Sequence, residues 1–97
     1  MKLKLILSKQ AGRFVQKLPP KQYKQVVQST LSLLNNPEPH DSKQLKGSEQ
    51  GNRRVDIGEY RVVYRLDDDE LKVLVIGKRN DDHVYKILVT IQLVDNL

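Results

Sequence analysis

Three arginines are the residues of this chain best suited to chemistry on an anion. Arg54 and Arg61 stand in two runs rich in valine, isoleucine and tyrosine, and Arg79 follows the third such run. A guanidinium stays protonated in proteins, so these side chains can bind phosphate and stabilise developing negative charge, but they make poor general bases. An RNA phosphodiester can be cleaved without metal when its own 2′-hydroxyl attacks phosphorus and cations stabilise the oxyanion. The arginines therefore indicate a clamp for a nucleic-acid backbone.

Proton transfer in such a reaction needs another group, and the candidates are Tyr85, His83, Lys78 and Glu59. Only His83 has an unperturbed pKa near neutrality. Each candidate has a structural alternative, because His83 can be a solvated loop residue and Tyr85 can be a core aromatic residue that anchors the tail. The proton carrier therefore stays open.

The composition is that of a small basic domain. The 97 residues are too few to bury a second core, so one domain over residues 1–97 is expected. Seventeen Lys and Arg against twelve Asp and Glu give a net charge of +5, which favours polyanions or an acidic protein partner. With no cysteine, two histidines and no nucleotide-binding glycine loop, we expect neither a metal nor a small-molecule cofactor.

The first residues do not form an apolar run. Lysines and leucines alternate there, so neither a signal peptide nor a membrane anchor is expected. A cytoplasmic protein with no membrane partner follows as the default expectation.

The periodicity predicts an α+β fold in the order β-α-α-β-β-β-α. Leucines at every second position over residues 3–7 indicate a strand with one buried face. Ser8 can cap a first helix that ends at Pro19, and a second helix begins at Pro20 and stops before Asn35. These two helices are expected to form an antiparallel hairpin over a sheet.

The second half of the chain predicts a three-stranded antiparallel meander. The strands are expected at residues 53–57, 60–66 and 71–76, after a polar loop over residues 37–50 that contains a short 43–46 segment. The tail over residues 83–94 fits a helix or a strand, and its apolar spacing favours the helix.

A two-residue turn at Gly58-Glu59 determines which residues of the hairpin share a face. Asp56 then lies opposite Arg61, and the pattern points Val55, Ile57, Tyr60, Val62, Tyr64, Leu66, Leu71, Val73 and Val75 toward the helices. The opposite face receives Arg54, Asp56, Arg61, Arg65, Lys72 and Lys78. Its apolar residues Val63, Leu74 and Ile76 are expected to be covered by the tail or by a partner.

Arg65 lies opposite Lys72 in this register, and such a like-charge pair suggests that an anion sits between them. The alternative is a charged face that only keeps the protein soluble, with Asp56 and Arg61 in a weak surface salt bridge. Both interpretations of the basic face stay open on charge pattern alone.

Several short blocks together resemble the RelE/ParE superfamily of bacterial toxins. They are KQLKG at 43–47, RRV at 53–55, GEYRVVYR at 58–65, VIGKR at 75–79 and VYK at 84–86, and the break at Leu18-Pro19 between two helices also fits. The resemblance extends over the chain to about Lys86. It implies a compact sheet flanked by two helices.

For the RelE branch, the resemblance implies a metal-independent, ribosome-dependent endoribonuclease that cuts mRNA in the decoding site. Matching positions make Arg61 the phosphate clamp, Arg79 a second cation at the scissile phosphate and Tyr85 the base-stacking residue. Arg54 falls where the RelE branch tends to place a catalytic lysine, and Asp56 would compete with phosphate for Arg61. Further cations expected to bind RNA are Arg53, Arg65, Lys72, Lys78, Lys43 and Lys46.

The departures leave other functions open. The ParE branch has the same fold and inhibits DNA gyrase by binding, without RNA chemistry, and a third alternative is a toxin-like fold with weakened activity. The presence of Arg61, Arg79 and Tyr85 together favours the nuclease, whose partner is the ribosome with mRNA. All three alternatives imply a cognate antitoxin, usually acidic and partly disordered, that covers the basic face.

Overall fold

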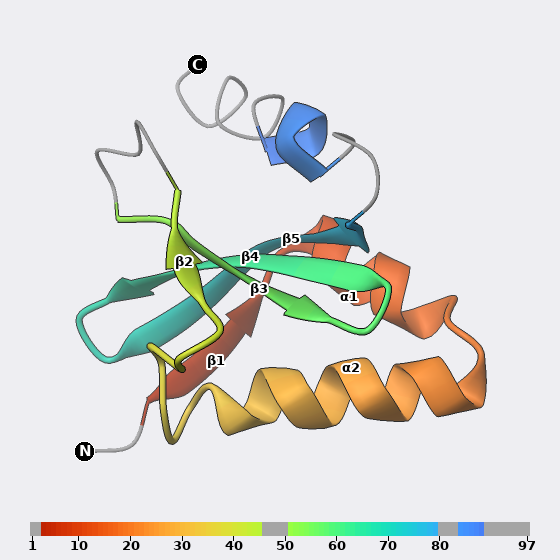
Figure 1. The fold of residues 1–97 in the computed structure, drawn as a ribbon, viewed down its shortest axis with the longest axis horizontal. Helices are drawn as coiled ribbons and strands as arrows, with labels where there is room; N and C mark the ends of the chain where they lie inside the picture. Colours follow the sequence, from red (N-terminus) through yellow and green to blue (C-terminus); the bar gives the residue numbers. More distant parts are fainter. Residues whose placement is uncertain (1–2, 46–50, 80–83, 89–97) are drawn as a thin grey trace.

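A five-stranded sheet is the central layer of the molecule. The computed structural model describes residues 3–45, 51–79 and 84–88, and within them the strands follow the order β1-β5-β4-β3-β2 (Figure 1). The strands are β1 (Lys4–Leu7), β2 (Lys43–Gln44), β3 (Arg53–Ile57), β4 (Tyr60–Asp67) and β5 (Glu70–Lys78). β1 runs parallel to β5, and every other neighbouring pair is antiparallel. The expected α+β order is confirmed, and the short strand β2 is added within the expected polar loop.

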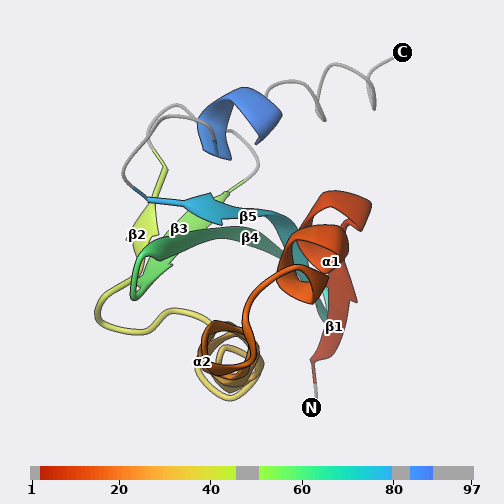
Figure 2. The same cartoon turned by 90° about the vertical axis from the view of Figure 1, so that its right-hand side faces the viewer.

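Two helices cover one face of this sheet. α1 (Lys9–Gln16) and α2 (Pro20–Ser32) lie on one side, while residues 84–88 form a helical turn on the other (Figure 2). Ser8 caps α1 as expected, since its hydroxyl accepts a hydrogen bond of 3.1 Å from the Ala11 amide. Pro20 occupies the first turn of α2, where its missing N–H is not needed. The helical interpretation of the tail is confirmed for residues 84–88, and the rest of the tail lies outside the described residues.

The sheet has an apolar core on each face. The larger core lies against α1 and α2, and its buried members are Ala11, Val15, Val26, Leu33, Val55, Ile57, Tyr60, Val62, Tyr64, Leu71, Val73 and Ile76. The smaller core consists of Val63, Val75, Val84 and Leu88, with Leu45, Leu74 and Ile87 packed against it. The tail therefore covers the apolar part of the second face, which is one of the two expected ways of burying it.

The register of the β3–β4 hairpin agrees with the expectation. Asp56 pairs with Arg61, and Gly58 in the turn has a φ of +59°, a conformation that glycine adopts without strain. On β4 and β5, Arg65 pairs with Lys72 as expected. The face away from α1 and α2, which carries Arg54 and Arg61, is called the site face below.

The expected faces are wrong for the second half of β5. Tyr64 pairs with Val73 and Val63 pairs with Val75, so Leu74 is one extra residue in β5. After this bulge the alternation is shifted by one residue. Val75 consequently joins the core of the site face and Ile76 joins the core beneath α1 and α2, the reverse of the expectation.

No helix in the described part of the chain has the length and apolar character that a bilayer span requires.

Candidate nucleic-acid site

Arg61 is the centre of the charged cluster on the site face. Its Nε and Nη2 atoms donate to the two carboxylate oxygens of Asp56 at 2.7 and 3.2 Å, because cross-strand pairing places the two residues opposite each other. The Arg61 side chain is only 15% exposed and that of Asp56 is 34% exposed. A two-pronged guanidinium–carboxylate pair of this kind is held by geometry as well as by charge. The expected competition between Asp56 and an anionic ligand therefore has a structural basis.

Tyr85 completes the surroundings of Arg61. The Nη1 atom of Arg61 donates to the Tyr85 hydroxyl at 2.9 Å, and the guanidinium carbon lies 5.8 Å from the centre of the ring. The helical turn at residues 84–88 thus places an aromatic side chain beside the arginine. Tyr85 is half-buried, so it combines a packing role with a polar contact.

Several arginines share the charge of Asp56. The hydrogen bond from Arg61 is the main cause that lowers the pKa of Asp56, and the charges of Arg54 and Arg79 lower it further. Arg54 Nη1 lies 4.0 Å from Asp56 Oδ2. The same hydrogen bond from Arg61 to Asp56 raises the pKa of Arg61, so both groups stay charged. The structure therefore brings Arg54 and Arg61 to one carboxylate, on which the charge of Arg79 also acts, and bonds Tyr85 to Arg61.

Gly77 allows Tyr85 to reach Arg61. Gly77 pairs with Arg61 across β4 and β5, and a Cβ atom built on it would lie 2.8 Å from Cγ2 of Val84. Val84 is fully buried and branched at Cβ, so it has little freedom to move aside. The helical turn packs on the sheet at this position because the residue beneath Val84 has no side chain.

We expect Gly77→Ala to push residues 84–88 away from the sheet. Overpacking should lower the free energy of unfolding by about 1–3 kcal/mol and weaken the contact between Tyr85 and Arg61. Urea unfolding measures the stability change. Gly12→Ala is the matched control, because a Cβ built at that position in α1 would meet nothing within 4 Å beyond its chain neighbours and the backbone of its own helix. A Gly77→Ala protein as stable as Gly12→Ala would contradict the packing argument.

A second charged cluster lies further along the same face. Arg65 Nε donates to Asp67 Oδ2 at 3.0 Å, and Lys72 Nζ lies 3.1 Å from the same oxygen. The hydrogen bond from Lys72 is the main cause that lowers the pKa of Asp67. The Asp67 carboxylate therefore binds both Arg65 and Lys72. Their pairing suggested an anion between them, and the structure has this carboxylate of the chain itself there.

Acidification is expected to weaken the fold through Asp56 and Asp67. Each has a pKa below its ordinary value, near 3.9 in unfolded chains, so its stabilisation is complete above about pH 4 and is lost as pH falls through the folded-state pKa. Urea unfolding at several pH values should show stability falling below about pH 4. The fall of the free energy of unfolding with pH should be shallower in Asp56→Asn and in Asp67→Asn. If neither substitution changed this slope, the two carboxylates would not be the cause of the acid sensitivity.

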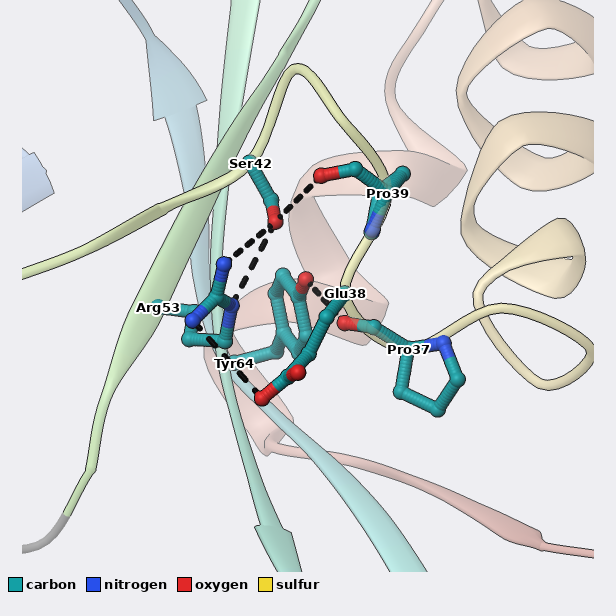
Figure 3. A network of polar contacts seen from close by, with 6 residues as sticks. All are labelled: Pro37, Glu38, Pro39, Ser42, Arg53 and Tyr64. Carbon is teal, nitrogen blue, oxygen red and sulfur yellow. Dashed lines mark hydrogen bonds and ion pairs between the residues drawn. The ribbon is translucent and has the colours of Figure 1, made fainter.

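Arg53 points away from this site. It pairs with Tyr64, which belongs to the core beneath the helices. Its Nη2 and Nε atoms donate to the Ser42 hydroxyl at 2.8 and 3.3 Å, and its Nη1 lies 3.8 Å from a carboxylate oxygen of Glu38 (Figure 3). The Ser42 hydroxyl donates to Pro39 O at 2.8 Å. The contacts of Arg53 hold the loop that leads into β2, so the structure does not bring Arg53 together with Arg61.

The other expected cations are divided between the two faces. Lys43 pairs with Arg54 and shares the site face, whereas Lys78 pairs with Tyr60 and therefore lies on the helix side, contrary to the expected face. His83 and Lys46 lie outside the described residues. Among the described residues, no group of three His, Cys, Asp or Glu side chains is arranged to hold a metal ion.

Two features of the site were not anticipated from the sequence. No contact was predicted for Asp67, although its position two residues after Arg65 and beside the turn is a usable signal for a contact with Arg65. The requirement for glycine at position 77 had a weaker signal, namely a glycine inside an apolar strand, which often marks close approach of another segment.

Comparisons with known proteins agree on the family. Residues 3–83 match the family model described as the ParE toxin of the type II toxin-antitoxin system, parDE. The search of curated proteins found no match.

Solved structures resemble the chain over most of its length. The archaeal RelE–RelB complex from Pyrococcus horikoshii contains a chain 27% identical to this one, with a TM-score of 0.72 over 82% of this chain and 98% of that chain. The toxin-antitoxin complex RelBE2 from Mycobacterium tuberculosis contains one that is also 27% identical, with a TM-score of 0.69 over 81% and 100%. A free RelE mutant from Escherichia coli, 22% identical, has a TM-score of 0.76 over 93% and 97%, which shows the shared fold. With the family match over residues 3–83, these likenesses establish that the chain belongs to the ParE toxin family of type II toxin-antitoxin systems, within the RelE/ParE superfamily.

Proposed function

We propose that this toxin is a metal-independent endoribonuclease of the RelE kind, which cuts mRNA on the ribosome. The observation that carries the proposal is the contact between Arg61 and Tyr85, with Arg54 and Arg79 acting on the same carboxylate. Two chains 27% identical to this one come from RelE–RelB and RelBE2 complexes, which supports the RelE kind.

Asp56 indicates where a phosphate would bind. A carboxylate and a phosphate both present two oxygens that match the fork of a guanidinium. The two Asp56 oxygens at 2.7 and 3.2 Å from Arg61 therefore occupy the places of two phosphate oxygens. RNA binding requires Asp56 to move aside, and Arg54, 4.0 Å from it, can hold the displaced carboxylate or a second phosphate oxygen.

The proposed reaction uses the nucleophile that RNA supplies. The 2′-oxygen forms a bond to phosphorus while the bond from phosphorus to the 5′-oxygen breaks, which leaves a 2′,3′-cyclic phosphate and a 5′-hydroxyl. One proton leaves the 2′-hydroxyl and one is delivered to the 5′-oxygen. Arg61 and Arg79 stabilise the extra negative charge on the phosphate oxygens in the transition state.

Tyr85 and His83 have separate proposed roles. The ring of Tyr85 would stack on a base beside the scissile phosphate, and its hydroxyl keeps Arg61 in place at 2.9 Å. His83 is the proposed proton carrier because an imidazole can lose and gain a proton near pH 7. Arg54 replaces a lysine of the RelE branch and binds without acting as a base.

Cations away from the centre extend the proposed RNA surface. Lys43 lies beside Arg54, and Arg65 lies four residues from Arg61 on β4, about 13 Å along an extended strand. Lys72 joins Arg65 around Asp67. Arg53 and Lys78 lie on the helix side and would meet RNA only at the edges of the sheet.

A cognate antitoxin is the proposed protein partner. The Pyrococcus horikoshii chain was solved in a RelE–RelB complex, and the Mycobacterium tuberculosis chain was solved in a toxin-antitoxin complex. The net charge of +5 and the arginines of the site face suit an acidic segment that covers the site.

Inhibition of DNA gyrase is the second candidate function. One observation favours it: Asp56 accepts hydrogen bonds from two donors of Arg61, so these donors are less available to a phosphate. The family model that matches is also that of ParE toxins. In this alternative the charged face binds protein and performs no RNA chemistry.

A paired assay separates the candidates. The proposed nuclease should cut mRNA on programmed ribosomes and leave gyrase-driven supercoiling unchanged. The gyrase inhibitor would block supercoiling and leave the mRNA whole, which would contradict the proposal. If the folded protein neither cuts mRNA nor blocks supercoiling, it is a toxin fold with weakened activity.

A further inference from the structure

The bulge in β5 decides which cation reaches the site. Lys72 and Leu74 lie on the site face, so strict alternation would continue with Ile76 and Lys78 on that face. The extra residue at Leu74 breaks this alternation. Ile76 faces the helices instead, and Lys78 pairs with Tyr60 of the same helix-side core.

The same shift places Arg79 on the site face. Its backbone N–H donates to Glu59 O at 3.0 Å, so it continues the ladder directly after Lys78. As the next residue after Lys78, it is aimed at the opposite face, where its charge contributes to lowering the pKa of Asp56. A regular β5 would exchange the two residues and turn Arg79 toward the helices.

Two side chains at the start of α1 hold the bulge in place. β1 accompanies β5 as far as Val73, whose carbonyl accepts from the Ser8 amide at 3.0 Å. Beyond that point the Ser8 hydroxyl donates to Leu74 O at 2.7 Å. The amide of Gln10 pairs with Ile76 in both directions, donating to its carbonyl at 2.8 Å and accepting from its N–H at 3.0 Å.

These bonds take the place of a neighbouring strand. Ile76 is 1% exposed, so its backbone groups would be costly to bury without partners. Gln10 matches both groups at once, as a residue of an adjacent strand would. If β5 were shifted by one residue, a residue other than Ile76 would present its N–H and C=O to Gln10. The side-chain amide of Gln10 therefore favours the register that the structure has.

We propose that Gln10, assisted by Ser8, is a positioning residue of the RNA site, which holds the extra residue of β5 and thereby keeps Arg79 on the face of Arg61 and Tyr85. The inference rests on the proposed function for its effect on cleavage. The placement of Arg79 itself does not depend on whether RNA is the substrate.

The first test measures the ionisation of Asp56, which needs no RNA. Titration of the carboxyl carbon by NMR in Arg79→Ala should give a raised pKa for Asp56, because one positive charge has been removed. Gln10→Ala should raise it by a similar amount, although the arginine is still present. Gln16→Ala is the matched control, because this glutamine is exposed in the same helix, and it should leave the pKa unchanged.

The second test asks whether Gln10 acts through Arg79. Gln10→Ala should reduce single-turnover cleavage of ribosome-bound mRNA by about tenfold to a hundredfold, the effect of a misplaced catalytic group. In an Arg79→Ala background, the same substitution should cause little further loss. A general structural role would lower activity equally in both backgrounds.

The outcomes separate this inference from the proposed function. A raised pKa of Asp56 in Gln10→Ala supports the positioning role even if the protein cuts no RNA. An unchanged pKa overturns it, whatever the activity. If Gln10→Ala does not fold, Ser8→Ala adds no charge, keeps both bonds of Gln10 and removes the hydroxyl that bonds Leu74 O and the Ala11 N–H, and it should show a smaller shift in the same direction.

Discussion

Replacing Arg61 with alanine is expected to reduce cleavage of ribosome-bound mRNA by about a hundredfold to a thousandfold, the usual cost of removing a donor to a developing oxyanion. Arg61 lies at the centre of the site, with donors on both Asp56 oxygens and on the Tyr85 hydroxyl. Primer extension across mRNA on programmed ribosomes measures the loss. The side chain points away from the core beneath the helices, so far-ultraviolet circular dichroism should remain that of the unsubstituted protein.

Two further variants show whether charge alone explains the effect. Arg13→Ala removes the same charge from an exposed position on α1, beneath the other face of the sheet, and should cleave normally. Arg61→Lys keeps the charge but cannot bind two oxygens in one plane, so it should recover only part of the activity. Cleavage by Arg61→Ala at the rate of Arg13→Ala would exclude Arg61 from the reaction.

Replacing Asp56 with alanine is expected to strengthen RNA binding by about tenfold, equivalent to about 1.4 kcal/mol. The substitution frees two donors of Arg61 and removes a negative charge that repels the phosphate. Fluorescence anisotropy with a labelled single-stranded RNA measures the affinity. Cleavage should be preserved or raised.

Asp41→Ala is the matched control for Asp56, because it removes the same charge from an exposed residue of the loop before β2. Its effect on RNA affinity should be much smaller than that of Asp56→Ala. A large loss of cleavage in Asp56→Ala, with the fold retained, would mean that Asp56 contributes to the reaction and does not merely compete with RNA.

The hairpin that carries Arg54 and Arg61 could be predicted because its determinants are local. A two-residue turn at Gly58 sets the register, and period-two alternation then assigns every side chain of β3 to a face. The structure has Asp56 opposite Arg61 as this reasoning requires. Alternation also places Arg53 and Arg54 on opposite faces of the sheet. Only one of these two neighbouring arginines can therefore contribute to the basic surface of the site face.

The shift in β5 could not be predicted from that strand. Val73, Leu74, Val75 and Ile76 are all apolar, so no polar residue reveals where the alternation changes. The groups that hold the bulge belong to Ser8 and Gln10, more than sixty residues earlier in the chain. A pattern read along one strand contains no signal from such a distant partner.

The contacts of Arg53 and Asp67 were missed for related reasons. Arg53 finds Ser42 and Glu38 in a polar loop whose path has no periodic signal. Asp67 lies beside a turn, where acidic residues are common without specific partners. In both cases, charged residues that pattern alone assigns to solvent or RNA are held by other parts of the chain.

The most direct test of the proposed chemistry changes one atom of the substrate. A ribosome-bound mRNA with a 2′-deoxy nucleotide at the cleaved position lacks the proposed nucleophile, whereas the matched all-ribose mRNA contains it. We expect the toxin to cut the all-ribose mRNA, leaving a 2′,3′-cyclic phosphate, and to leave the deoxy-substituted mRNA whole at that position. Cleavage of both substrates, or of neither, would contradict the proposed attack by the 2′-hydroxyl at the Arg61 site.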